Sequence, residues 1–129
     1  MNKVIVDTSA WIDFFRNQSG EIGDMVAALI EQDRAALVGP VLSELLQGLK
    51  TRQEATALNE LFSILPYLEI SRDDWEKAGD LLRSLRRNGI TVPLSDAIIA
   101  AAAQKNGHAV FTLDRHFEHL KVALHPAQN

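Results

Sequence analysis

The feature that most constrains this chain is a short apolar run near its start that ends abruptly at an acid. Val4, Ile5 and Val6 are consecutive β-branched residues, a pattern typical of a strand buried on both faces of a parallel sheet. Asp7 follows directly, and an apolar helical stripe begins soon after it. In open α/β sheets, ligands and catalytic groups collect at the carboxyl ends of strands. The sequence therefore predicts a functional carboxylate at Asp7, with a simple cap or turn as the alternative.

Strand and helix patterns alternate along the rest of the chain. Four further stretches have strand character: residues 36–38, 65–70, 108–111 and 122–124. Pro66 restricts the second stretch to a sheet edge or a strand start, because proline has no N–H to donate to a neighbouring strand. The alternation predicts an α/β domain with a mostly parallel sheet of four or five strands. With 129 residues, the chain suits a single domain over residues 1–129.

Residues that commonly cap helices mark several helix boundaries. Thr8 and Ser9 offer side-chain hydroxyls at the start of the first helix. The segment 71–74 resembles a capping box at the start of a longer helix. Ser95 is expected to cap a helix that begins at Asp96. That helix is apolar on nearly all sides, which predicts that it is buried.

Composition and charge exclude several classes of protein. The chain is 47% hydrophobic and 23% charged, as in ordered globular proteins, and it has no cysteine for disulfides, thiolate zinc sites or cysteine nucleophiles. Asp7 interrupts the first apolar run, which argues against a signal peptide. The longest apolar run, 97–103, is too short to cross a bilayer, so we expect a cytoplasmic protein without a membrane span. The net charge of −4 restricts nucleic-acid contacts to local basic patches.

Four acids stand out by their positions: Asp7, Glu44, Asp96 and Asp114. Asp7 and Asp114 follow strand candidates, and Asp96 opens the buried helix. Glu44 has apolar neighbours in its own helix, where a solvated charge is unexpected. Each acid has a structural alternative, as a helix cap, as a partner of the helix dipole, or as an exposed charge.

These acids suggest a metal site when they are considered together. A parallel sheet gathers strand ends and helix starts along one edge, and clustered carboxylates repel one another unless a cation lies between them. Oxygen ligands suit Mg²⁺ or Mn²⁺. A cation held by several carboxylates can activate water and stabilise displacement at phosphorus. The four acids therefore predict phosphodiester hydrolysis.

Four segments carry a resemblance to a known family. They are VDTSAWIDFF near the start, PVLSELLQG around Glu44, LSDAIIAAAA around Asp96 and VFTLDRHF around Asp114. In this order they resemble the PIN-domain ribonucleases, and more narrowly the VapC-like toxins of bacterial toxin–antitoxin pairs. The resemblance covers essentially the whole chain. It implies a PIN-like fold, a three-layer α/β/α sandwich around a parallel sheet.

The same resemblance implies a function and the residues that perform it. The four acids fall on the family's positions that hold Mg²⁺ or Mn²⁺, and Thr8 and Thr112 fall on the polar positions beside them. His116 stands where many relatives carry a further acid, which puts a full ligand set for a second metal in doubt. The family implies cleavage of single-stranded or structured RNA such as tRNA. It also implies a homodimer and inhibition by an antitoxin encoded next to the toxin.

Histidine and arginine side chains suggest further contacts. His116 and His119 have the spacing of a zinc pair on a helix, but no carboxylate motif of the zinc type accompanies them, and His116 could instead touch substrate phosphate. Arg83, Arg86 and Arg87 lie on one helical face and could carry the RNA backbone past the acids. The alternative is that these arginines are simply solvated and stabilise the C-terminal end of their helix through its dipole.

Three aromatic residues on the first helix suggest a partner surface. Trp11, Phe14 and Phe15 are more aromatic surface than one short helix normally needs, so part of this helix is expected to form a groove for an amphipathic antitoxin helix, with an antitoxin arginine reaching the acids. Core packing of at least one of them is the alternative. The rival function is a non-catalytic PIN-like module that binds RNA or protein. Because the chain keeps all four acids, the enzyme is the favoured interpretation.

Overall fold

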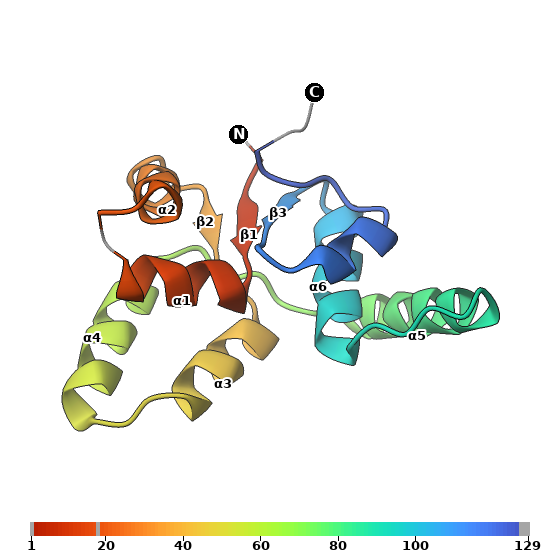
Figure 1. Cartoon of the computed structure of the whole chain (residues 1–129), viewed down its shortest axis with the longest axis horizontal. Coiled ribbons are helices and arrows are strands. Elements are labelled where there is room, and N and C mark those ends of the chain that lie inside the picture. The colour runs from red at the N-terminus through yellow and green to blue at the C-terminus, as the bar shows by residue number, and fades with distance from the viewer. Residues whose placement is uncertain (1, 18, 127–129) are drawn as a thin grey trace.

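The computed structural model describes residues 2–17 and 19–126, in which strands and helices alternate as predicted (Figure 1). The strands are β1 (Val4–Val6), β2 (Ala35–Ala36) and β3 (Ala109–Phe111). The helices are α1 (Thr8–Arg16), α2 (Glu21–Glu31), α3 (Gly39–Gln47), α4 (Arg52–Ser63), α5 (Arg72–Arg87), α6 (Leu94–Lys105) and the short 3-10 helix η1 (Arg115–His119). Within these residues, no helix is both long and apolar enough to cross a membrane.

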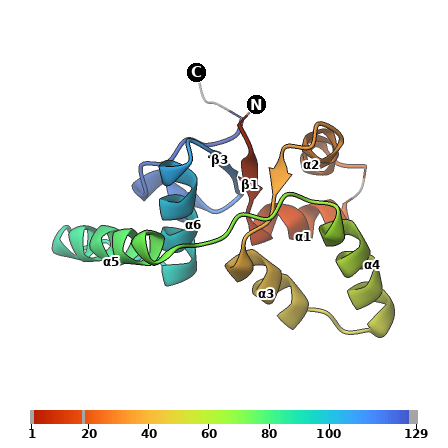
Figure 2. The same cartoon turned by 180° about the vertical axis from the view of Figure 1, so that it is seen from behind.

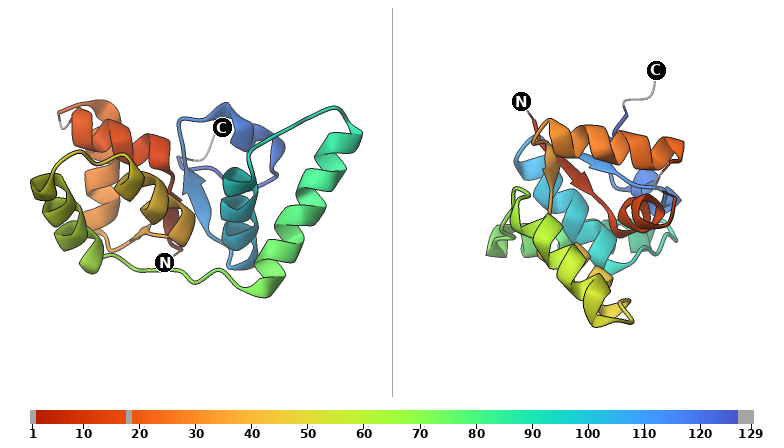
Figure 3. Two further views of the ribbon diagram at one scale, coloured as in Figure 1. Left: turned by 90° about the horizontal axis from the view of Figure 1, so that it is seen from below. Right: turned by 90° about the vertical axis from the view of Figure 1, so that its left-hand side faces the viewer.

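The helices lie on two sides of the strands, in the predicted three-layer arrangement. Figure 3 (left) shows α1 to α4 on one side of the strands and α5 and α6 on the other. Helix α6 packs between β3 and α5, and residues 96–103 are all buried. Its apolar residues on all sides account for that burial, which confirms the prediction for this helix.

Strand β1 lies at the centre of the sheet, between β2 and β3, and pairs in parallel with both. Val4 pairs with Ala35 on one side and with Ala109 on the other, and all three residues of β1 are fully buried. Burial on both faces is why the strand consists of β-branched apolar residues alone. Because the strands are parallel, the chain leaves β1 and β3 at the same edge of the sheet.

The sheet has three strands in the described residues, fewer than the four or five predicted. The segment 65–70 makes a single parallel bridge, between Leu37 and Tyr67, at the outer edge beyond β2. Pro66 contributes only its carbonyl oxygen, which accepts from the Leu37 N–H at 2.9 Å. The segment then turns away toward α5. An edge position for this segment follows from the missing proline N–H, as the sequence indicated.

The last predicted strand, 122–124, also reduces to a single bridge, between Val110 and Leu124. The Val110 N–H donates to the Ala123 carbonyl at 2.9 Å, and the His125 N–H donates to the Val110 carbonyl at 2.8 Å. The segment is short because η1 ends only a few residues before it. Both segments therefore lie beside the sheet without forming regular ladders.

Two predictions for helix starts are wrong. Pro93 occupies the N-cap position of α6, and Ser95 lies inside the first turn without capping it. Proline suits a helix start because its ring fixes φ and the first turn does not need its N–H. Thr8 and Ser9 lie inside α1, with Asp7 at the N-cap position, so their hydroxyls are free for contacts outside the helix.

Trp11 is fully buried and anchors α1 in the core. Its ring centroid lies 5.1 Å from that of Phe62 on α4, in an edge-to-face contact, and 5.7 Å from that of Phe14. Truncating a buried aromatic of this size typically costs about 3–5 kcal/mol. Trp11 therefore belongs to the core and cannot line an exposed groove, whereas Phe14 is half-buried and Phe15 is 38% exposed.

Candidate metal centre

Asp7 is held rigidly where the chain leaves the sheet. Its N–H donates to the Phe111 carbonyl at 2.9 Å, which ties it to the end of β3, and the residue is only 5% exposed. Asp7 stands at the N-cap position of α1, yet its carboxylate makes no capping hydrogen bond to that helix. The capping alternative therefore does not account for this side chain.

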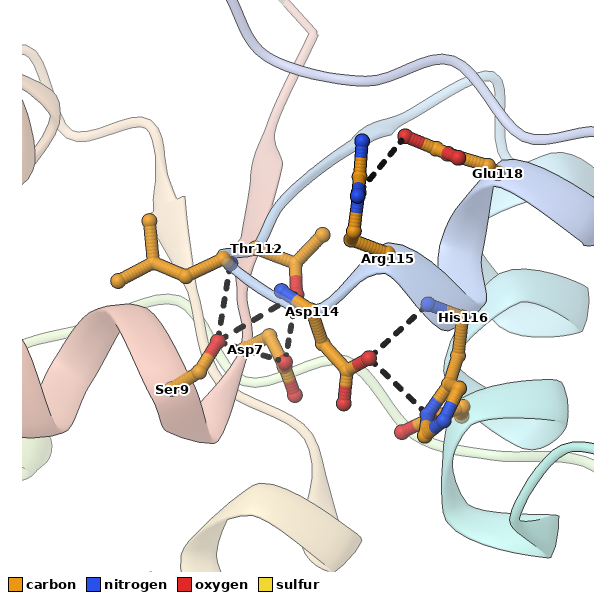
Figure 4. A network of polar contacts seen from close by, with 9 residues as sticks. Asp7, Ser9, Thr112, Asp114, Arg115, His116 and Glu118 are labelled. Carbon is orange, nitrogen blue, oxygen red and sulfur yellow. Dashed lines mark hydrogen bonds and ion pairs between the residues drawn. The ribbon is translucent and has the colours of Figure 1, made fainter.

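Two hydroxyl groups hold the Asp7 carboxylate instead (Figure 4). Its Oδ2 atom accepts from Thr112 Oγ1 at 2.8 Å and from Ser9 Oγ at 3.1 Å. Each hydroxyl also accepts a backbone N–H, Thr112 from Asp114 at 2.9 Å and Ser9 from Leu113 at 3.0 Å. These bonds join the start of α1 to the loop after β3. They fix one Asp7 oxygen and leave its Oδ1 to other ligands.

Asp114 combines a structural role with a place in the cluster. Its Oδ1 atom accepts from the His116 N–H at 2.9 Å, which caps η1 as the structural alternative predicted. The same oxygen lies 3.0 Å from Nδ1 of His116. Arg115 lies between these two residues in the chain, but its side chain is directed toward Glu118 and away from the carboxylates (Figure 4).

Asp96 completes the cluster from the first turn of α6. Its Oδ2 atom lies 3.0 Å from Nδ1 of His116, and the residue is 7% exposed. Burial raises the pKa of the Asp96 carboxyl to about 6, the His116 hydrogen bond opposes this rise, and the charges of Asp7 and Asp114 add to it. The sequence prediction that α6 places an acid beside the strand-end acids is confirmed.

Three side chains present potential ligand atoms to one point. One carboxylate oxygen each from Asp96 and Asp114 and one ring nitrogen of His116 all lie within 4.8 Å of one another. The distances from His116 Nδ1 to the Asp96 and Asp114 oxygens, 3.0 Å each, suit neighbouring ligands of one small divalent cation, which lie at roughly 2.0–2.2 Å from the ion. His119, which has the spacing of a zinc pair with His116 in the sequence, is not part of this group.

Glu44 lies farther out than the sequence suggested. It is exposed on α3 and is linked to α1 by the Thr8 hydroxyl, which donates to its Oε1 at 3.3 Å. The structure therefore brings three of the four predicted acids together and leaves Glu44 at the rim. Thr8 and Thr112 have different partners: Thr112 holds Asp7, and Thr8 holds Glu44.

The predicted arginine face lies apart from the cluster. Arg83, Arg86 and Arg87 are on the C-terminal half of α5, which points away from the strands, and the chain must return from there to the start of α6 (Figures 1 and 3). Arg83 pairs with Asp80 at 3.0 Å in the solvent-exposed part of this helix. Their contact with RNA stays a prediction.

Ser9 is the site residue that sequence reasoning missed. The sequence predicts an N-cap hydroxyl there, whereas the Oγ atom connects Asp7 with the loop after β3. The sequence did contain a signal. Ser9 lies two positions after Asp7, and because Asp7 occupies the N-cap position of α1, the Ser9 hydroxyl is not needed for capping. His116 was considered as a contact to substrate phosphate and as the position where many relatives carry a further acid. Its position between Asp96 and Asp114 makes it central to the group.

Comparison with known proteins identifies the family of this chain. The sequence matches the PIN domain family over residues 4–123. It is 31% identical over 119 residues to VapC ribonuclease Mb1587 of Mycobacterium bovis, covering 89% of both chains. Ribonuclease VapC11 of Mycobacterium tuberculosis matches with the same identity and coverage.

Solved structures share the fold. The chain superposes on VapBC from Salmonella typhimurium, solved bound to DNA, with a TM-score of 0.80 and 24% identity over 95% of each chain. VapC20 of M. tuberculosis, described as a sarcin-ricin loop cleaving toxin, gives a TM-score of 0.71 and 20% identity over 93% of this chain and 96% of the other. The chain therefore belongs to the PIN domain family, and within it to the VapC-like proteins.

Proposed function

We propose that this protein is a Mg²⁺- or Mn²⁺-dependent endoribonuclease, the toxin of a toxin–antitoxin pair, acting in the cytoplasm. The observation that carries the proposal is the convergence of Asp7, Asp96, Asp114 and His116 at one edge of the sheet. Its relatives at 31% identity are named ribonucleases, and one structural neighbour is described as a sarcin-ricin loop cleaving toxin. RNA is accordingly the substrate that we assign.

The residues present fit a divalent cation. Asp96 and Asp114 supply carboxylate oxygens, His116 supplies a nitrogen, and Asp7 keeps one oxygen free of the hydroxyls that hold the other. The raised pKa of Asp96 reflects an excess of negative charge in a buried place, which a cation relieves. When bound, such an ion polarises phosphate oxygens and lowers the pKa of the water molecule that it binds, so that hydroxide forms more easily at neutral pH.

The chain's own residues position the reacting groups. Ser9 and Thr112 keep the Asp7 carboxylate from rotating, so its free oxygen has a fixed direction. Asp114 is fixed in the same way by the backbone N–H of His116. Fixed ligands matter because a misplacement of about 1 Å can cost a hundredfold in rate. Glu44 lies at the exposed rim of the cluster, where it would contact substrate that enters from solvent.

His116 bears on which ion binds. Mg²⁺ binds oxygen ligands almost exclusively, whereas Mn²⁺, although it also favours oxygen, is a transition metal that accepts an imidazole nitrogen more readily than Mg²⁺ does. A group of two carboxylates and one imidazole therefore favours Mn²⁺ relative to an all-carboxylate site. We assign Mn²⁺ as the better activator of this protein and Mg²⁺ as a weaker one.

An antitoxin is the proposed protein partner. Several neighbours in the fold comparison are toxin–antitoxin complexes, including VapBC from S. typhimurium. Two adjoining hollows of about 300 and 370 Å³ lie between α1, α3 and α4, and both are lined by Phe15, Leu49 and Leu58. Glu44 lines the first of them, so a cationic side chain from a bound helix would meet a carboxylate there.

Cleavage of RNA by the purified protein tests the catalytic proposal. Labelled single-stranded RNA and tRNA should be cut in Mn²⁺ or Mg²⁺ and left intact in EDTA. Asp7→Asn should abolish the cut, and Asp24→Asn, an exposed acid in the first turn of α2, should leave it unchanged. RNA binding without cleavage in any metal would support the alternative, a non-catalytic PIN-like module.

A further inference from the structure

The turn that follows η1 is tied back to α6 by a side chain that has no part in the proposed site. The Nε2 atom of Gln104, near the end of α6, donates to the Leu120 carbonyl at 2.9 Å and to the Lys121 carbonyl at 2.6 Å. We propose that Gln104 is a positioning residue, which sets the direction of the His116 imidazole toward the metal. The inference rests on the proposed metal-dependent nuclease, and it adds a residue that lies outside the group of ligands.

Helix α6 holds η1 at two points along one of its faces. Asp96 and Gln104 are eight positions apart, a spacing that places two side chains on the same stripe of an α-helix, about 12 Å apart along its axis. Asp96 meets His116 at 3.0 Å, and Gln104 meets the end of η1. Figures 1 and 2 show η1, in blue, beside α6 in views from opposite sides. A shift of η1 relative to α6 would therefore change the distance between His116 and Asp96.

Apolar packing holds η1 against the core but does not set its rotation. Phe117 and Leu120 are buried and are three positions apart, so they lie on one side of a 3-10 helix. Burial of apolar side chains is favourable in many orientations, because the hydrophobic effect is non-directional. Hydrogen bonds are directional. The pair from Gln104 restrains the end of η1, as the Asp114 carboxylate restrains its start by accepting from the His116 N–H.

The chain turns sharply at Lys121, where the second of these hydrogen bonds ends. Lys121 has a φ of 52°, in the left-handed region that residues other than glycine rarely adopt. From there the chain runs back to the bridge between Val110 and Leu124. Carbonyls at the end of a helix have no partner within it, and the Gln104 amide has two N–H groups, so this side chain serves both carbonyls. Gln104 thus holds the turn after η1 in its uncommon conformation.

Gln104→Met tests the proposal, because methionine is similar in length and favours helices but cannot donate a hydrogen bond. Pulsed EPR of bound Mn²⁺ should show coupling to the ¹⁴N of His116 in wild type and weaker coupling in Gln104→Met. By calorimetry, affinity for Mn²⁺ should fall by roughly tenfold, the lower end of the usual effect of groups that orient a metal ligand. Affinity for Mg²⁺ should fall less, because Mg²⁺ depends mainly on the carboxylate oxygens of the cluster.

Two further variants distinguish positioning from a general loss of stability. Asn106→Ala removes another side-chain amide at the end of α6, which donates to the Ala102 carbonyl of the same helix at 3.0 Å, and it should bind Mn²⁺ as wild type does. Lys121→Gly, added to Gln104→Met, should recover much of the ¹⁴N coupling. Glycine adopts a positive φ without strain, so the turn then needs less support from Gln104.

Melting curves in EDTA show which variants are folded. If Gln104→Met does not fold, Gln104→Glu answers the same question, since it keeps the shape and exchanges the donors for acceptors. Equal ¹⁴N coupling in wild type and the folded variant would overturn the positioning role, whereas RNA cleavage in Mn²⁺ would still support the nuclease. An equal loss of affinity for Mn²⁺ and Mg²⁺ would also overturn it, because the effect would then be general. Failure of the proposed function is seen separately, as wild-type protein that leaves RNA intact in every metal.

Discussion

The Nδ1 atom of His116 lies 3.0 Å from Oδ2 of Asp96, across 20 positions of sequence. The same nitrogen lies 3.0 Å from Oδ1 of Asp114, so one imidazole nitrogen faces two carboxylates at once. A single N–H cannot serve both acceptors fully. A cation bound by His116, Asp96 and Asp114 would satisfy all three groups together. Replacing His116 therefore tests the metal site directly.

Replacing His116 should change the preference between metals. We expect His116→Asp to bind Mg²⁺ more tightly and Mn²⁺ no better than wild type, because it exchanges a nitrogen ligand for an oxygen. Calorimetric titration of each metal measures the change. Pulsed EPR of bound Mn²⁺ should show coupling to a ¹⁴N nucleus in wild type and in His119→Gln, and no such coupling in His116→Asp. Identical spectra for wild type and His116→Asp would place the imidazole outside the metal site.

Asp7→Asn should lower RNA cleavage by at least about a hundredfold. Asparagine keeps the volume and can still accept from the Ser9 and Thr112 hydroxyls, so the local structure should persist. The lost charge removes a ligand that positions the attacking water, which costs several kcal/mol in the barrier. Single-turnover cleavage rates measure the effect. Wild-type rates from the purified variant, with contaminating nuclease excluded, would remove Asp7 from the catalytic group.

Ser9→Ala should lower the cleavage rate by about tenfold and leave folding largely intact. It removes one of the two hydroxyls that hold Asp7 and leaves the Leu113 N–H without its acceptor. Loss of such supporting hydrogen bonds typically costs 10–100-fold in activity or metal affinity. Ser9→Thr restores a hydroxyl and should recover part of the rate. A similar loss in Ser84→Ala, an exposed serine on α5 outside this network, would indicate a non-specific effect.

The parts of this fold that follow local rules were predictable from sequence. The β-branched run ending at Asp7 predicted the central strand and the acid at its end, and both are confirmed. Residues 71–74 predicted a capping box at the start of α5, and Ser71 and Asp74 form it. In each case the signal lies within a few residues of the structure that it specifies.

Features that depend on distant partners were not predictable in the same way. Segments 65–70 and 122–124 have strand composition, but ladder formation requires a neighbour in register along several residues, and each finds only one bridge. Ser9 matters because the loop after β3 lies beside it, which local sequence does not reveal. Glu44 has apolar neighbours in sequence and is nonetheless exposed, because a helix also has a face directed to solvent.

Phe15→Ala should weaken antitoxin binding by roughly tenfold or more and leave RNA cleavage unchanged. Phe15 is 38% exposed and lines both hollows between α1, α3 and α4. Buried aromatic anchors of an interface commonly contribute 2 kcal/mol or more, which is roughly thirtyfold in affinity. Surface plasmon resonance with the cognate antitoxin measures the change, and Ile64→Ala is the matched control. Equal affinities for Phe15→Ala and wild type would place the antitoxin on another face.

The metal site should make the metal-free protein less stable as pH rises. The pKa of Asp96 is about 6 in the folded protein and about 3.9 in an unfolded chain, so the folded state holds its proton more tightly. Stability should therefore fall between about pH 4 and pH 6 and level off above that range, with a loss on the order of 2–3 kcal/mol. Urea unfolding in EDTA across this range measures the loss.

Asp96→Asn should remove that loss and most of the response to metal. At neutral pH in EDTA it should melt several degrees above wild type, because asparagine carries no charge to bury beside Asp7 and Asp114. Saturating Mn²⁺ should raise the melting temperature of wild type by mass action and that of Asp96→Asn much less, while cleavage falls sharply. Asp73→Asn, an exposed acid in the first turn of α5, should show neither effect. The contrary result is that Asp96→Asn melts below wild type in EDTA and gains as much from Mn²⁺ as wild type does. Asp96 would then stabilise the start of α6 and would not be a metal ligand. The reason is that removing a charge should raise the stability of the metal-free protein only if that charge belongs to the cluster.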